Sequence, residues 1–97
     1  IELYKKYQHN PYVDIKNVTI KNRYTTTRFG SCNAKKRTIN INTHLVHYDL
    51  IYLEYVFLHE ISHLTHQNHG PKFYQLLEQL SPNYKQLRRE LKNSFQR

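Results

Sequence analysis

Two histidines four residues apart, with a glutamate directly after the first, are the strongest chemical signal in this sequence of 97 residues. They are His59, Glu60 and His63, in an otherwise largely apolar stretch. In an α-helix, positions four apart differ by about 40° around the axis and about 6 Å along it, so both imidazoles would project from one face. Two such imidazoles can share one zinc ion, and Glu60, one step round the helix, can accept a proton from a water that the ion activates. The H-E-x-x-H pattern is typical of metallopeptidases and predicts zinc-dependent hydrolysis.

A third zinc ligand is expected shortly after this helix, because a catalytic zinc site takes three protein ligands and keeps a fourth position open. His66 would lie within about 20° of His59 on a continuing helix, so the three imidazoles of one face would approach the ion almost in a plane. Tetrahedral coordination favours a ligand from another direction, and the loop residue His69 provides one. We therefore predict zinc ligands at His59, His63 and His69.

Several other residues are candidates for the site. Cys32 as a fourth ligand would make the zinc site structural, but its strand has no second metal-binding residue at a useful spacing, which favours a small buried thiol. A tyrosine hydroxyl is a candidate for polarising a substrate carbonyl. The residues considered for that role are Tyr24, Tyr74 and Tyr84. His44 and His47 precede the helix and are interpreted as surface or hydrogen-bonded histidines.

The composition is that of a small basic domain. The chain has 15 Lys and Arg against seven Asp and Glu, a net charge of +8, which favours acidic partners such as nucleic acid or nucleotides. The basic residues form small scattered clusters, for which a solvated surface is the simpler interpretation. No apolar run is long enough to cross a bilayer, and a single cysteine suits the reducing cytoplasm.

Domain organisation follows from the same numbers. A chain of this length forms one domain, so we expect residues 1–97 to fold as a single unit. The sequence starts at Ile1 and contains no methionine. We therefore expect it to be a fragment of a longer chain.

A short sheet is predicted before the metal-binding helix. Apolar alternation and β-branched residues predict strands over 18–22, 24–32 and 37–43. Gly30 interrupts the second strand, where another group is expected to approach the backbone closely. The polar turn after the second strand predicts an antiparallel hairpin with the third. We therefore expect an antiparallel three-stranded sheet.

The helices are predicted from apolar spacing and from proline. Apolar residues at three- and four-residue steps from Leu50 to Leu64 predict a helix that ends at about residue 65 or 66. Asp49 is suited to cap its start by accepting backbone N–H bonds. Two further helices are predicted to begin at Pro71 and at Ser81-Pro82. The fold class is therefore α+β, with the sheet packed on the metal-binding helix and further helices towards the C-terminus.

Four segments carry a resemblance to a known family. They are Arg28-Phe29-Gly30-Ser31-Cys32, Ile39-Asn40-Ile41-Asn42, the helical segment from Tyr55 to Leu64, and Asn68-His69-Gly70-Pro71-Lys72-Phe73. In this order they resemble the YgjP-like metallopeptidase domain, a relative of the SprT-like proteases among the zincins, and the resemblance covers about Thr25 to Leu91. The family pattern has Trp, Leu and Ser in place of Phe29, Ile61 and Gly70, and its N-terminal part is fuller.

The resemblance implies a small zincin-like α+β core, zinc ligands at His59, His63 and His69, and Glu60 as general base. We therefore predict a cytoplasmic zinc metallopeptidase that acts on peptides or proteins. An extended peptide would pair with the hairpin edge, with Arg28 near the cleft.

Two alternatives stay open. One is a metal-dependent hydrolase of nucleotides or other non-peptide substrates, which would use the same activated water on a phosphoanhydride. The other is a basic nucleic-acid-binding module in which the metal only stabilises the fold. The absence of an RNA-stacking sheet motif or a clear recognition helix counts against the second alternative.

Overall fold

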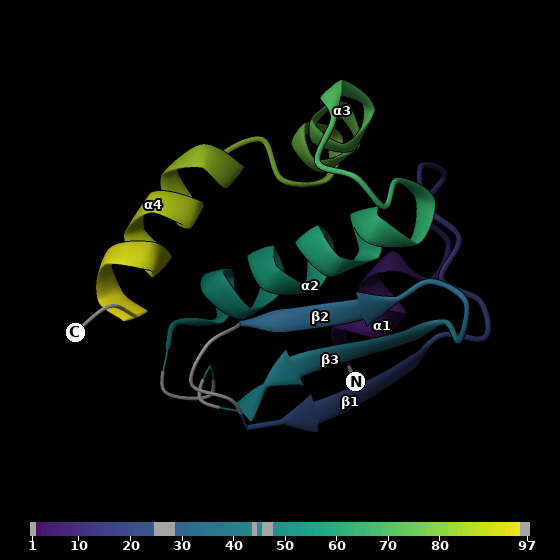
Figure 1. Ribbon diagram of the computed structural model, residues 1–97, viewed down its shortest axis with the longest axis horizontal. Helices are drawn as coiled ribbons and strands as arrows, with labels where there is room; N and C mark the ends of the chain where they lie inside the picture. Colours follow the sequence, from purple (N-terminus) through teal and green to yellow (C-terminus); the bar gives the residue numbers. More distant parts are fainter. Residues whose placement is uncertain (1, 25–28, 44, 46–47, 96–97) are drawn as a thin grey trace.

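A three-stranded sheet and a long helix packed against it form the centre of the molecule (Figure 1). The computed structural model describes residues 2–24, 29–43, 45 and 48–95. The strands of this described part are β1 (Thr19–Arg23), β2 (Gly30–Asn33) and β3 (Thr38–Asn42). Its helices are α1 (Glu2–Tyr7), α2 (Leu50–Thr65), α3 (Pro71–Leu80) and α4 (Tyr84–Phe95). The predicted α+β class is confirmed.

The sheet is mixed, so the prediction of a wholly antiparallel sheet is wrong. Its strand order is β1-β3-β2, with β2 antiparallel to β3 and β1 parallel to β3. The predicted hairpin between the second and third strands is confirmed. The wrong part of the prediction is the pairing of β1. After β1 the chain forms β2 at the opposite edge of the sheet, and β3 then returns between the two strands and runs parallel to β1. The second strand is also shorter than predicted, and residues 25–28 of its predicted range lie outside the described residues.

One face of the sheet carries the core. Ile39 and Ile41 of β3 are buried against α2, and their partners in β2 are Cys32 and Gly30. Since partners in a ladder share a face, Gly30 and Cys32 also face α2. This pairing places the two residues of β2 opposite the helix that carries His59, Glu60 and His63.

Helix α2 is buried on most of its circumference over its second and third turns. Its residues from Tyr55 to Leu58 are all buried, because the sheet covers one side and α3 and α4 cover the other. The predicted apolar stripe begins later than expected, since Leu50 is 64% exposed. Asp49 occupies the predicted N-cap position, but its side chain makes no capping hydrogen bond, so the predicted cap interaction is wrong. Among the described residues, no helix has the length and apolar character that crossing a membrane requires.

The two C-terminal helices pack on α2. Pro71 lies in the first turn of α3, as predicted. The prediction that Ser81 caps the last helix is wrong, because the Ser81 backbone N–H donates to Leu77 O and ends α3 instead. A backbone bond from Tyr84 N–H to Ser81 O closes the turn that follows. Helix α4 therefore begins at Tyr84 and buries Tyr84, Leu87 and Leu91.

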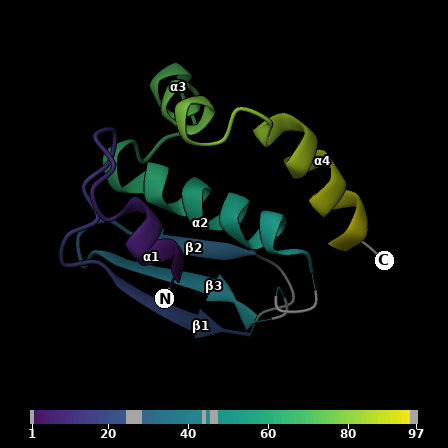
Figure 2. The ribbon, with the colours of Figure 1, turned by 180° about the vertical axis from the view of Figure 1, so that it is seen from behind.

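Helix α1 lies beside α2 on the same face of the sheet (Figure 2). The Tyr7 hydroxyl donates to Glu54 Oε2, which also accepts a hydrogen bond of 2.6 Å from Lys6 Nζ. Burial alone would raise the pKa of Glu54, but these two hydrogen bonds outweigh burial and lower it. Glu54 therefore stabilises the fold in its ionised form.

This contact predicts an acid-dependent loss of stability. A carboxyl group whose pKa is lowered by folding contributes stability that is fully present above its unfolded pKa, near 4.5, and is lost as the pH falls through its folded pKa. We expect the free energy of unfolding of the wild type to fall more than that of Glu54→Gln between pH 6 and pH 3, measured by urea denaturation. If the free energy of unfolding depends on pH in the same way in both proteins, the ionised Glu54 carboxylate does not stabilise the fold.

Candidate metal centre

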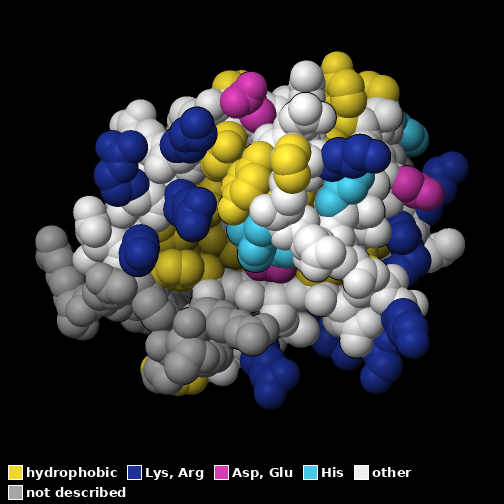
Figure 3. Space-filling view, turned by 45° about the horizontal axis from the view of Figure 1, so that its top comes forward, with side chains coloured by type: hydrophobic (Ala, Val, Ile, Leu, Met, Phe, Trp, Pro, Cys, Tyr) yellow, Lys and Arg dark blue, Asp and Glu magenta, His cyan; other side chains and the backbone are white. Residues whose placement is uncertain are grey.

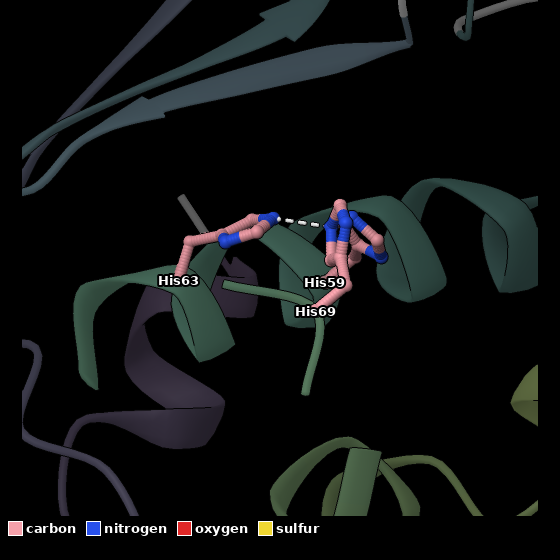
Figure 4. A group of neighbouring side chains, drawn as sticks. All are labelled: His59, His63 and His69. Carbon is pink, nitrogen blue, oxygen red and sulfur yellow. Dashed lines mark hydrogen bonds between the residues drawn. The ribbon is translucent and has the colours of Figure 1, made fainter. Parts of the chain in front are cut away.

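Three imidazoles converge between α2 and the loop that follows it (Figure 4). His59 and His63 lie on successive turns of α2, and His69 comes from the loop before α3. One ring nitrogen of each residue lies within 4.8 Å of the others, and the ring centroids are 4.6 to 5.3 Å apart. Three nitrogens this close can reach a single cation with small side-chain movements, because zinc binds imidazole nitrogen at about 2.0 to 2.1 Å.

The hydrogen bonds of His63 leave a suitable nitrogen for a metal. Its Nδ1 lies 3.1 Å from Gln67 O, so a neutral His63 donates from Nδ1 and keeps a lone pair on Nε2. That Nε2 lies 2.9 Å from His69 Nε2. A backbone carbonyl that orients the ring through its second nitrogen is the usual arrangement around a metal-binding histidine. The donor set therefore fits a zinc ion.

His59 is the most enclosed member of the group. Its pKa is lowered to about 4, first by burial and then by the positive charges that His63, His69 and Arg88 can carry, in that order. Its Nδ1 is buried and has no hydrogen-bond partner among the described residues. His63 also has a lowered pKa, chiefly from burial. Both imidazoles are therefore neutral at neutral pH, which is the form that binds metals.

Phe73 forms a wall behind the three imidazoles. Its ring centroid lies 4.6 to 5.1 Å from those of the three histidines, and the residue is fully buried at the start of α3. The wall restricts the rings to the side that faces the cleft. The sequence alone predicts no role for Phe73, although Phe73 ends the fourth segment that carries the family resemblance.

Glu60 lies between α2 and the sheet, next to the imidazoles. It is 6% exposed and lines the cleft together with His59 and His63. The absence of a side chain at Gly30 makes room for it, since a Cβ at Gly30 would lie 3.2 Å from Glu60 Cγ and 3.1 Å from Val56 Cγ1. The same Cβ would lie 2.9 Å from the backbone oxygen of Asn40, which has little freedom to move. The groups that approach the backbone closely at Gly30, as predicted, therefore belong to α2 and β3.

Gly30→Ala is expected to disturb both the fold and the position of Glu60. We expect a loss of about 1 to 3 kcal/mol in the free energy of unfolding, the usual cost of overpacking. A displaced carboxylate should also lower kcat/KM by up to roughly 10²-fold. The matched control is Gly70→Ala, because a Cβ at the only other glycine meets nothing within 4 Å. Equal behaviour of the two variants would contradict a positioning role for Gly30.

A cleft of about 600 Å³ opens beside the three histidines. One wall is the edge strand β2 with the turn after it, from Gly30 to Lys35, and the other is the end of α2 with His69. A smaller pocket of about 220 Å³ adjoins Glu60 and His59 and is lined by Phe29, Gly30, Tyr55 and Val56. The aromatic walls of this side pocket come from separate elements and were not identified from the sequence.

Two other candidate residues, His66 and Cys32, lie outside the imidazole group. His66 follows the last residue of α2 in an extended conformation and lines a different surface hollow. Cys32 lines the cleft as a half-buried thiol whose pKa is raised to about 11, first by burial and then by the charge of Glu60, so it stays protonated at neutral pH. Arg28, His44 and His47 lie outside the described residues.

The three tyrosines considered differ in position. Tyr24 is 67% exposed and does not line the cleft. Tyr74 has its ring centroid 6.2 Å from that of His69 and stacks on the buried Tyr84. Tyr74 is therefore nearest to the imidazoles of the three.

Comparison with known proteins finds a matching family and similar folds. The family model described as YgjP-like, metallopeptidase domain, matches residues 1–94. The fold is similar to the crystal structure of the metallopeptidase zymogen abylysin of Pyrococcus abyssi, with 19% identity, a TM-score of 0.82, and 99% of this chain and 94% of that chain covered. It is also similar to the metallopeptidase zymogen jannalysin of Methanocaldococcus jannaschii, with 21% identity, a TM-score of 0.73, and 96% and 89% covered. A search of curated proteins finds no match.

Proposed function

This chain belongs to the YgjP-like metallopeptidase family and is a peptidase, and from that premise we propose that it cleaves peptide bonds with a zinc ion bound by His59, His63 and His69. The convergence of these three imidazoles beside the buried carboxylate of Glu60 supports the proposal most strongly. Three neutral nitrogen donors with an open fourth position are the usual ligand set of a catalytic zinc site. Zinc, when bound, supplies a Lewis acid that polarises a carbonyl and lowers the pKa of water towards about 7.

Glu60 is the proposed general base. It follows His59 in the sequence and lines the cleft beside His59, His63 and His69, without being a member of the imidazole group. We propose that Glu60 takes a proton from the attacking water and returns it to the leaving amine. The packing of α2 against Gly30 restricts how far this side chain can move away from the cleft.

The substrate is proposed to bind as an extended strand. β2 lies at the edge of the sheet, and its residues Gly30 to Asn33 line the cleft. An extended peptide can form main-chain hydrogen bonds with such an edge and place a side chain in a neighbouring pocket. The proposed contact of Arg28 with the substrate and the cytoplasmic location both stay predictions.

The two alternative functions are not favoured. Peptidase family membership over residues 1–94 indicates protein or peptide substrates rather than nucleotides. A catalytic metal accounts for the three converging histidines, so a purely structural metal is not needed to explain them.

Chelation tests the proposed function. The protein, loaded with one equivalent of zinc, is incubated with casein and a mixed peptide library, and cleavage is followed by mass spectrometry. We expect cleavage to stop with a chelator and to return on addition of zinc, with no hydrolysis of a parallel nucleotide panel. Cleavage that is unaffected by complete removal of zinc would refute the proposal.

A further inference from the structure

Helix α4 is connected to the imidazole group by a chain of stacked and neighbouring rings. At its start, Tyr84 stacks on Tyr74 with ring centroids 5.8 Å apart, and Tyr74 is the neighbour of His69. Six residues later, Glu90 accepts a hydrogen bond of 2.8 Å from the hydroxyl of Tyr52, which lies near the start of α2. Helix α4 therefore extends from the imidazole group back towards the beginning of α2 (Figure 1).

Arg88 lies one helical turn after the buried Tyr84 on the same side of α4, at the edge of the face that packs on α2. The pKa of Tyr55 is raised to about 12, mainly by burial, and the charge of Arg88 opposes this rise. The pKa of His59 is lowered to about 4, mainly by burial, and the charge of Arg88 contributes to this lowering. Tyr55 and His59 both line the side pocket, and their ring centroids are 6.1 Å apart. Because Tyr84 stacks on Tyr74 and Tyr74 is the neighbour of His69, Arg88 lies one helical turn from the tyrosine rings that lead to the proposed metal ligands.

The surface formed by α4 is strongly positive. Figure 3 shows Lys and Arg side chains beside hydrophobic side chains that lie next to the histidines. Helix α4 carries four exposed cations, Lys85, Arg88, Arg89 and Lys92. Among the described residues Arg88 forms no salt bridge, and Glu60 is the only acidic residue that lines the cleft or the side pocket. Arg88 is therefore available to an anionic group of a substrate.

We propose that Arg88 selects substrates that carry a carboxylate on the α4 side of the scissile bond. The proposal deepens the proposed peptidase function and rests on it. A guanidinium group binds a carboxylate through two parallel hydrogen bonds, and this paired geometry distinguishes arginine from lysine. The carboxylate comes either from an acidic side chain or from the C-terminus of the substrate, and both present the same chemical group.

Matched peptides distinguish these sources. One peptide carries Glu within three residues of the cleaved bond and an amidated C-terminus, a second carries Gln in its place, and a third carries Gln with a free C-terminal carboxylate. We expect native protein to favour the Glu peptide, the free-acid peptide or both over the amidated Gln peptide by about fivefold in kcat/KM, mainly through KM. Equal kcat/KM values for all three peptides would overturn the proposal.

Arg88→Glu is expected to remove or invert this preference, and Arg88→Lys to keep only part of it. The control is Arg89→Glu, which makes the same charge change. Because a helix turns about 100° per residue, Arg89 lies on the side of α4 opposite the buried Tyr84, Leu87 and Leu91. Arg89→Glu should leave the preference within about twofold of native. An equal loss of preference in the Arg89 and Arg88 variants would refute a specific role for Arg88.

Binding without turnover separates this proposal from the proposed function. Zinc-loaded Glu60→Gln protein is titrated with the three fluorescently labelled peptides, with Arg88 native or changed to Glu. Preferential binding of a carboxylate peptide that is lost with Arg88→Glu supports the proposal even where no peptide is cleaved. Zinc-dependent cleavage of all three peptides with no preference leaves the peptidase proposal standing and refutes the role of Arg88.

Discussion

Replacing Glu60 with glutamine is expected to lower kcat/KM by about 10²- to 10⁴-fold while leaving zinc bound. General-base catalysis contributes rate factors of this size, and an amide cannot accept the proton. Glutamine has nearly the same shape as glutamate, so the closely packed position against Gly30 should be preserved. Peptide cleavage kinetics and the zinc content of the same preparation measure both parts of this prediction.

A control variant separates the role of Glu60 from a general effect of charge. Glu78→Gln makes the same chemical change at an exposed position of α3 and should leave kcat/KM within about twofold of native, since surface substitutions away from special features have small effects. If Glu60→Gln retains zinc and cleaves peptides at the native rate, Glu60 is not the general base.

His69→Ala is expected to weaken zinc binding by at least about 100-fold. Loss of groups that merely orient a ligand already costs 10- to 100-fold in affinity, and the loss of one of three ligands should cost more. His66→Ala should change the affinity by less than about twofold, because His66 lies outside the imidazole group. Competition with a chromophoric chelator gives both affinities. Loss of zinc in the His66 variant with retention in the His69 variant would reverse the proposed ligand set.

The imidazole group could be anticipated from the sequence because local geometry determines most of it. The spacing of His59 and His63 places both rings on one face of any helix that contains them. The structure ends α2 at Thr65 and brings His69 back from the loop, in line with the argument that a third ligand should come from another direction. The metal itself and the roles of these residues stay proposals.

Features that depend on distant parts of the chain were not accessible in the same way. Nothing in the sequence of β1 indicates whether it pairs with β2 or β3, because strand propensity carries no information about the partner. The beginning of α4 was misplaced because Ser81-Pro82 fits a helix start locally, whereas the backbone of Ser81 completes α3. In the sequence, Arg88 is only one of several scattered basic residues, since its place relative to the imidazoles depends on how α4 packs against α2.

The central claim is that one zinc ion is held by two residues of α2 and one of the following loop. A crystal structure of the zinc-loaded protein, with anomalous diffraction data collected at the zinc edge, tests it most directly. We predict a single strong peak bound at about 2.0 to 2.1 Å by one nitrogen each of His59, His63 and His69. A zinc peak elsewhere in a fully loaded crystal, or one coordinated by His66 in place of His69, would contradict the account.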